Sequence, residues 1–146
     1  MARSRVGFPR IGTCMSFDEK TIDQVLAMKT WAVVGLGNNP ERAAYRVAKL
    51  LQDKGHKIVP VYPRAEEVHG ESGYKTLSEI PFPIDVVDCF VNSKLVGKVV
   101  DEAIAIGAKA VWLQLDVIDQ DAVNRAEAAG LLAIMDRCPA IEYRKR

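Results

Sequence analysis

Two closely spaced glycines, Gly35 and Gly37, follow the apolar run 30–34 and let an anion approach the backbone. Asn39 and Pro40 come next, and these residue types suit the N-cap and the first position of a helix. A helix that begins there turns its free N–H groups and the positive end of its dipole toward the anion. The pattern therefore predicts a phosphate-binding loop and a nucleotide ligand. The residues assigned to the loop are Gly35, Leu36, Gly37, Asn38 and Asn39.

The loop leaves the class of nucleotide open, because Pro40 stands where the GxGxxG fingerprint has its third glycine; a tight turn without a ligand is the alternative. Arg42 follows in the first helical turn, where the dipole opposes a cation unless an anion compensates, so Arg42 is a phosphate-binding candidate. Arg46 lies on the same helix face as Arg42, and two interpretations are open for it: a ligand contact or an ordinary surface arginine. After the next strand, where an NAD site presents an acid to the ribose, the chain has Arg64. This cation favours NADP or coenzyme A (CoA), although Glu66 leaves an acidic contact open.

Groups for acid–base or metal chemistry are few. His56 follows Gly55 and is expected to have a turn or surface role, and His69 lies in a loop without an assigned acid or nucleophile. The three cysteines, Cys14, Cys89 and Cys138, are widely separated and odd in number, which favours neither a disulfide framework nor a metal site. Cys89 stands in an apolar run and is expected in the core.

Cys138 is the one candidate for a reactive side chain. It follows Asp136 and Arg137 just beyond the last predicted strand, and a nearby arginine can lower the pKa of a thiol. No general base is evident beside it, so a partly buried structural thiol is the simpler interpretation.

The apolar periodicity predicts alternating strands and helices. Strands are expected at 31–36, 57–62, 85–91, 110–115 and 131–135, and helices at 16–28, 41–54, 93–106 and 120–129, with a loop at 63–84. Ser16 and Glu19 form a capping box for the first helix. The apolar strand 84–91 indicates a parallel sheet covered on both faces. The predicted fold is a doubly wound, Rossmann-like α/β domain of about five parallel strands, preceded by an N-terminal helix.

Length and composition agree with a single domain. The 146 residues are divided into a tail at 1–15, one domain at 16–143 and a basic, solvated tail at 144–146. Acids and bases nearly balance at a net charge of +1, which argues against a nucleic-acid partner.

No apolar run approaches the roughly 20 residues that cross a bilayer, and no secretory signal is seen, so we expect a cytoplasmic protein. In such sheets ligands bind where strand order reverses, which is where the glycine loop is expected.

Several blocks in the same order resemble the small stand-alone CoA-binding proteins, which are similar to the CoA-binding domain of the succinyl-CoA synthetase alpha subunit. The likeness covers about residues 16–143. The blocks are Val33-Val34-Gly35, Pro40-Glu41-Arg42, Tyr45-Arg46-Val47, Val61-Tyr62-Pro63-Arg64, Ala110-Val111-Trp112-Leu113-Gln114-Leu115 and Met135-Asp136-Arg137-Cys138-Pro139.

The resemblance implies that loop 35–39 and Arg42 hold the CoA diphosphate. It further implies that Tyr62, Pro63 and Arg64 flank the 3′-phosphate end, and that Val91, Asn92 and Ser93 line the adenine side. Gln114 either reaches the ligand cleft or satisfies a loop carbonyl. Gly37 stands where the family often has Ser, and Ala43-Ala44 where it often has Pro-Ser, which removes two hydroxyls that could bond phosphate.

The leading hypothesis is a CoA or acyl-CoA binding module without catalysis of its own, acting as a carrier, a sensor or a partner subunit. The synthetases phosphorylate a histidine in a further domain, so their ligase activity is not carried over. One alternative is an NADP-linked oxidoreductase that uses the same loop and Arg64. Another is a redox protein in which Cys138 forms a mixed disulfide with CoA.

Overall fold

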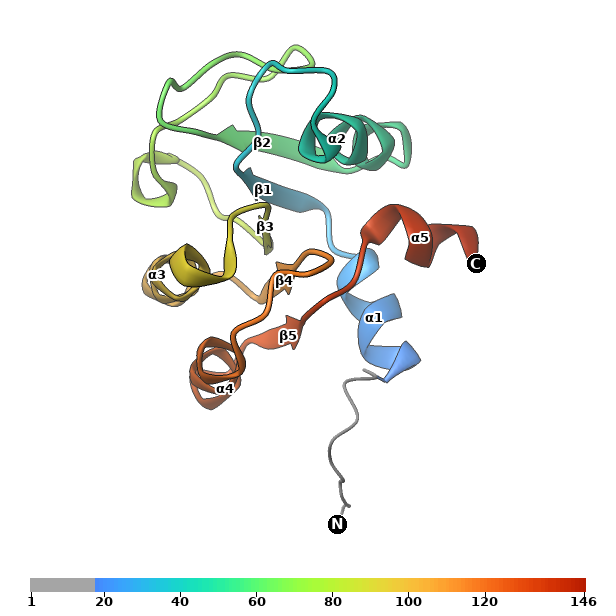
Figure 1. The fold of residues 1–146 in the computed structure, drawn as a ribbon, viewed down its shortest axis with the longest axis vertical. Coiled ribbons are helices and arrows are strands. Elements are labelled where there is room, and N and C mark those ends of the chain that lie inside the picture. Colours follow the sequence, from blue (N-terminus) through green and yellow to red (C-terminus); the bar gives the residue numbers. More distant parts are fainter. Residues whose placement is uncertain (1–17) are drawn as a thin grey trace.

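A five-stranded, all-parallel sheet lies at the centre of the computed structural model, which describes residues 18–146 (Figure 1). The strand order is β2-β1-β3-β4-β5. The strands are β1 (Thr30–Val34), β2 (Lys57–Val61), β3 (Val86–Cys89), β4 (Ala110–Leu113) and β5 (Leu132–Ile134). The helices are α1 (Glu19–Leu26), α2 (Ala43–Asp53), α3 (Ser93–Ala105), α4 (Gln120–Ala128) and α5 (Pro139–Arg144), with a 3₁₀ turn at Leu77–Glu79. The predicted α/β class is confirmed.

Strand order reverses at β1, as the doubly wound prediction requires. After β1 the chain crosses to β2 on one side and later returns to β3 on the other. Val34 at the end of β1 pairs with Val61 of β2 and with Cys89 of β3. The turn that follows Val34 therefore leaves the sheet at its switch point, where doubly wound domains bind their ligands.

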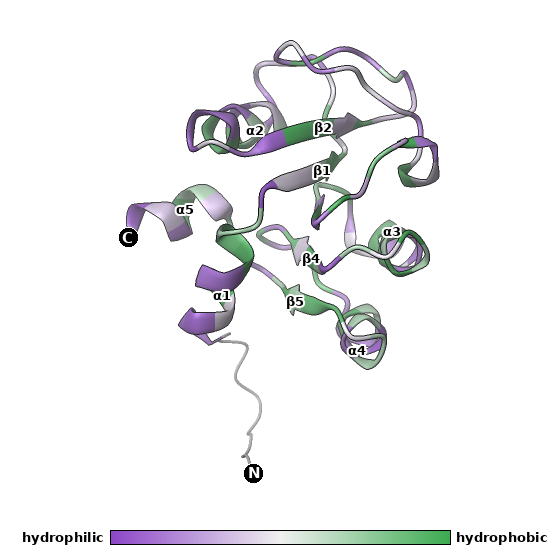
Figure 2. Cartoon of the chain, turned by 180° about the vertical axis from the view of Figure 1, so that it is seen from behind, coloured by the Kyte–Doolittle hydropathy of each residue, from purple (hydrophilic) through white to green (hydrophobic). Residues whose placement is uncertain are grey.

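Helices cover both faces of the sheet, so its strands are apolar on both sides (Figure 1). On one face Ala32, Val87 and Val111 pack with α3 and α4. On the other, Trp31 and Trp112 pack with α1 and α2. Figure 2 shows hydrophobic residues on the strands and hydrophilic ones on the exposed turns of α1 and α5. Within residues 18–146 no helix combines the length and apolarity needed to cross a membrane.

The start of α2 differs from the prediction. A helix from 41 with Asn39 as its N-cap is wrong, because α2 begins at Ala43 and Arg42 is its N-cap residue. The reason is local: the Asn39 side-chain oxygen accepts the N–H of Glu41 at 3.0 Å, and the Asn39 carbonyl accepts the N–H of Arg42. Asn39 thus closes a turn ahead of the helix and leaves the N-terminus of α2 without a side-chain cap.

The N-terminal helix is capped by Asp18, whose carboxylate accepts the N–H of Lys20 at 2.9 Å. The predicted cap Ser16 lies outside the described residues. The helix ends at Leu26, two residues before the predicted end at Met28.

Arg144, Lys145 and Arg146 are exposed, as expected of a solvated basic end, and ion pairs hold this end against the rest of the chain. Arg144 closes α5, a helix that the sequence analysis did not predict and that has Pro139 in its first turn. Arg146 pairs with Glu19 and Asp23 of α1 and with the buried Glu142. These contacts join the two ends of the described chain beside the sheet.

The turn after β1 requires glycine. Gly35 has φ +99°, and a Cβ there would lie 2.3 Å from the Phe90 carbonyl oxygen; Gly107 has φ +76° with open space around it. We expect Gly107→Ala to lower the free energy of unfolding by about 1–2 kcal/mol through strain alone. Gly35→Ala should lower it by about 3 kcal/mol or more, because the backbone must also shift. Urea unfolding of both variants measures the difference, and equal losses would contradict the close approach.

Candidate nucleotide-binding site

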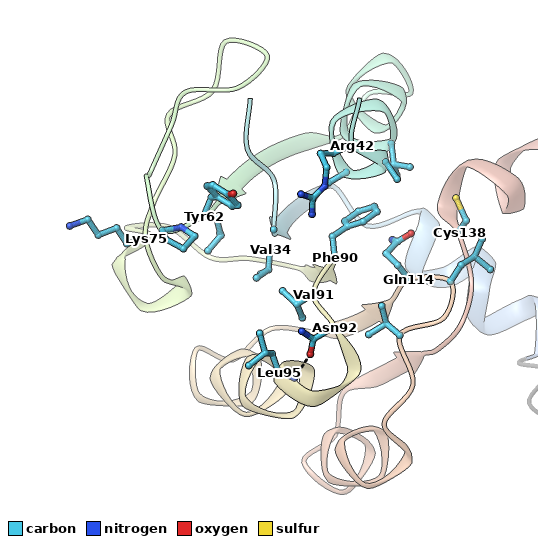
Figure 3. A pocket seen from close by; sticks show the side chains of 18 residues that line it. Val34, Arg42, Tyr62, Lys75, Phe90, Val91, Asn92, Leu95, Gln114 and Cys138 are labelled. Carbon is cyan, nitrogen blue, oxygen red and sulfur yellow. Dashed lines mark hydrogen bonds between the residues drawn. The ribbon is translucent and has the colours of Figure 1, made fainter. Parts of the chain in front are cut away.

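Two adjoining cavities open at the carboxyl edge of the sheet, beside the switch point. The main cavity, of about 730 Å³, extends from Lys75 to Cys138 along the ends of the strands (Figure 3). The polar pocket, of about 250 Å³, lies over the glycine loop. Gly35, Arg42 and Tyr62 line both cavities, so one elongated ligand could occupy the two together.

The glycine loop is fixed to the strands on either side of β1. The N–H of Gly35 donates to the Val61 carbonyl at 2.8 Å, and the N–H of Phe90 donates to the Val34 carbonyl at 2.9 Å. Of the five predicted loop residues, Gly35, Gly37, Asn38 and Asn39 line the polar pocket. Leu36 does not, because its side chain is fully buried in the core.

The uncapped N-terminus of α2 supplies a second set of donors. Ala43 and Ala44 line the main cavity, and their N–H groups have no acceptor among residues 18–146. Arg42 precedes them and projects toward the cavity above Phe90, and within the same residues its guanidinium has no acceptor or ion-pair partner (Figure 3). A cation and free N–H groups at a helix N-terminus form an anion site. Ala43 and Ala44 are not among the predicted site residues, because alanine has no polar side chain and these two contribute only backbone N–H groups.

An acidic side chain already occupies part of the glycine loop. The Glu66 carboxylate accepts the N–H of Asn38 at 3.0 Å, and the Asn38 amide donates to the Glu67 carbonyl at 2.7 Å. Glu66 therefore shares the polar pocket with the cations Arg42 and Arg64. The sequence left an acidic contact to the ribose open at Glu66, and the structure places this carboxylate in the pocket, bonded to the loop.

Most of the other predicted residues reach the cavities. Tyr62, Pro63, Val91 and Asn92 line the main cavity, and Arg64 lines the polar pocket. The Asn92 side-chain oxygen caps α3 by accepting the N–H groups of Lys94 and Leu95, as Figure 3 shows for Leu95.

Besides Leu36, two predicted residues, Arg46 and Ser93, line neither cavity. The Arg46 guanidinium donates to the Glu41 carbonyl at 2.8 Å. The Ser93 hydroxyl donates to the Asp116 carbonyl and accepts the N–H of Ile118 at 2.9 Å. Ser93 therefore positions the turn after β4.

The lining residues that were not predicted from sequence include the apolar Phe90, Leu95, Leu115 and Val117. Phe90 and Leu115 follow the ends of β3 and β4, so the rule that ligands bind at the carboxyl edge was the signal that could have found them. Lys75, which also lines the cavity, carried no such signal because it lies in an irregular segment.

Gln114 reaches the main cavity from a buried position, with only 5% of its surface exposed. Its side-chain nitrogen donates to Asp88 on β3, a carboxyl rather than the loop carbonyl considered from sequence. Figure 3 shows the Gln114 oxygen on the cavity side. Burial raises the pKa of Asp88 to about 8, so this carboxyl is mostly protonated at neutral pH. Its second oxygen is buried without a partner within residues 18–146.

The remaining titratable candidates divide between core and cavity. Cys89 is buried, as predicted, whereas Cys138 is half-buried and lines the main cavity. The expected surface or turn role of His56 is wrong in part, because its ring is buried against Trp31 and bonded to the Met28 carbonyl. Burial lowers the His56 pKa, which keeps the ring neutral. His69 bonds the Tyr45 carbonyl, and the described residues contain no cluster of three metal-ligating side chains.

The parallel sheet, the glycine turn at its switch point and the open helix N-terminus define a Rossmann-like domain. Residues 29–144 match the family described as CoA binding domain, and the chain belongs to that family.

Relatives include small proteins and one region of larger enzymes. The protein YneT of Bacillus subtilis (strain 168) is 36% identical over 115 residues, which are 79% of this chain and 85% of YneT. The alpha subunit of acetate–CoA ligase [ADP-forming] II from Pyrococcus furiosus is 38% identical over 81 residues, 55% of this chain but only 18% of that subunit. A solved structure from Pyrococcus horikoshii OT3 has a TM-score of 0.85 at 35% identity and covers 94% of this chain and 98% of its own. The chain is thus homologous to the CoA-binding region of these ligase subunits and to small proteins of similar length.

The buried Asp88 carboxyl predicts a pH dependence of stability. An unfolded Asp loses its proton near pH 3.8, whereas folded Asp88 holds its proton up to about pH 8. The folded state therefore binds more protons in this window, and stability falls as pH rises through it. Asp88→Asn removes this pH-dependent loss of stability, and the asparagine oxygen can still accept the hydrogen bond from Gln114. The variant should be more stable than the wild type at pH 7.5 by a few kcal/mol, and nearly equal to it at pH 4.

Urea unfolding at the two pH values tests this expectation. His56 is present in both proteins, so its own titration cancels in the comparison. A difference of the same size at both pH values would mean that Asp88 titrates normally.

Proposed function

We propose that the chain binds CoA or an acyl-CoA, with the diphosphate between the glycine loop and the N-terminus of α2. The observation that carries this proposal is Arg42, which stands unpaired within residues 18–146 beside the free N–H groups of Ala43 and Ala44. This cluster lies where the two cavities meet, and it supports an anion in the middle of a long ligand.

The two cavities differ in the way that the two ends of CoA differ. The polar pocket contains Arg42 and Arg64, and it suits the phosphate-bearing nucleotide end. The main cavity continues past Phe90 to Gln114, and it suits the uncharged pantetheine arm, whose amides can bond to polar side chains. An NADP-linked oxidoreductase could use the same cations, so binding must be compared directly.

If the chain binds CoA without catalysing a reaction, its role is that of a carrier, a sensor or a partner module in the cytoplasm. Cavity-lining residues within 18–146 provide one thiol and no histidine, and the Gln114 amide is held by a mostly neutral carboxyl. The ligase alpha subunit in which a homologous region occurs is much longer than this chain. A separate protein that performs the chemistry on the bound thioester fits this arrangement.

Titration calorimetry with CoA, dephospho-CoA, NADP and NAD tests the proposal. CoA should bind most tightly, and dephospho-CoA should bind more weakly because it lacks the 3′-phosphate near Arg64. A preference for NADP would support the oxidoreductase, and absence of binding for all four would overturn the nucleotide site.

A mixed disulfide with CoA is a second candidate, favoured by the position of Cys138 on the main cavity. The Cys138 thiolate would attack one sulfur of CoA disulfide, forming the protein–CoA disulfide as the other half leaves as CoA thiolate. Mass spectrometry after treatment with CoA disulfide should find one adduct, at Cys138. Labelling of all three cysteines, or of none, would count against this reaction.

Arg42→Ala should weaken CoA binding by about 1.5 to 3 kcal/mol, because a charged hydrogen bond to phosphate is lost. Arg46→Ala is the matched control: it removes the same charge one turn along, from a side chain that lines neither cavity. Calorimetry on both folded variants separates a direct contact from a general effect of net charge. Equal affinities would remove Arg42 from the site.

Glu66→Gln should tighten CoA binding by about 1 kcal/mol, because it removes a negative charge near the phosphates. The glutamine oxygen can still accept the N–H of Asn38. Glu67→Gln is the control, since this neighbour contributes only its backbone carbonyl to the loop. Weaker binding by the Glu66 variant would instead place this carboxylate on the ribose hydroxyls of the ligand.

A further inference from the structure

The far part of the main cavity is lined by apolar side chains that follow β3 and β4. We call this part the apolar end, and define it by Phe90, Val91, Leu95, Leu115 and Val117. Leu95 and Leu115 are 56% and 49% exposed, although both are large hydrophobic residues. Their apolar surface is open to solvent, so an apolar group placed against it would gain free energy by displacing water.

Charge is distributed unevenly along the cavity. The charged lining residues within 18–146 are Arg42 and Lys75, from the N-terminus of α2 and the segment beside β2. The polar side chains near the apolar end are Asn92 and Gln114, both uncharged (Figure 3). Arg42 lies above Phe90 at the near boundary of the apolar end, and an anion held there directs the remainder of an elongated ligand toward Leu95 and away from this cation (Figure 3).

The apolar end is held in shape by hydrogen bonds between its elements. The Ser93 hydroxyl joins the start of α3 to the turn after β4 through Asp116 and Ile118. The N–H of Asp116 donates in turn to the Asp136 carboxylate at 2.7 Å, beyond β5. Leu95 and Leu115 thus stand on two segments that are tied together, which lowers the entropy lost when a ligand binds.

We propose that the apolar end is an acyl subsite, and that the ligand is a thioester of CoA with an uncharged aliphatic acyl group. This inference rests on the proposed function and adds the class of acyl group. A dicarboxylic acyl group would bring a carboxylate among the apolar side chains of Leu95, Leu115 and Val117, and losing its hydration there is costly. An aliphatic group would instead cover the exposed leucines.

Calorimetry with CoA, acetyl-CoA, butyryl-CoA, hexanoyl-CoA and succinyl-CoA tests the subsite. Affinity should rise from acetyl to hexanoyl, by up to about fourfold for each methylene that is buried. Butyryl-CoA and succinyl-CoA have acyl chains of the same length. Butyryl-CoA should bind at least about tenfold more tightly than succinyl-CoA. Binding of CoA with no gain for acyl groups, or with succinyl-CoA favoured, would overturn the subsite and leave the proposed function intact. No binding of CoA or of any thioester would overturn both.

Two variants locate the effect. Leu115→Ser should remove most of the gain of hexanoyl-CoA over CoA, with both affinities measured on the same variant so that any change in CoA binding itself cancels. Ile118→Ser is the control, because Ile118 is similarly exposed, at 45%, and lies outside the main cavity. Equal gains in the two variants would overturn the assignment of the apolar end.

Discussion

The close approach of β1 and β3 at Gly35 is the constraint on which the rest of the site depends. The Phe90 carbonyl lies so near to Gly35 that no Cβ can stand between them, and the Gly35 N–H is bonded to Val61 on the other side. Where the chain leaves β1, it is therefore fixed to both neighbouring strands. Because it leaves at the switch point, the loop that follows opens over the strand ends, and α2 starts beside the cavity.

Unsatisfied groups collect at this edge while the sheet behind it is well packed. Arg42 stands at a helix N-terminus, where the dipole opposes a cation, and the N–H groups of Ala43 and Ala44 lack acceptors within residues 18–146. Glu66 satisfies only the Asn38 N–H. An anion beside Arg42 would compensate the helix dipole and the free donors together, which is the physical argument for the proposed position of the phosphates.

The sequence predicts the order and type of the main elements because strands buried on both faces and amphipathic helices leave strong patterns. It fails at boundaries that one side chain decides. Asn39 bonds the N–H of Glu41 instead of capping the helix, and α2 begins later for that reason. The glycine loop and Arg42 could be predicted from local spacing. Phe90 and Leu115 carry no local signal of this kind and need the strand order together with the carboxyl-edge rule, because only the strand order brings residues so far apart in sequence to one cavity.

The polarity of the site follows from the same topology. The α2 side of the switch point contributes Arg42, whereas the β3 and β4 side contributes Phe90, Leu115 and an amide held by the mostly neutral Asp88. If Asp88 were ionised, a second negative charge would lie near any anion bound at this edge. Its raised pKa keeps that side of the cavity uncharged at neutral pH. A ligand with one anionic and one apolar end would match both halves, as the proposed CoA thioester does.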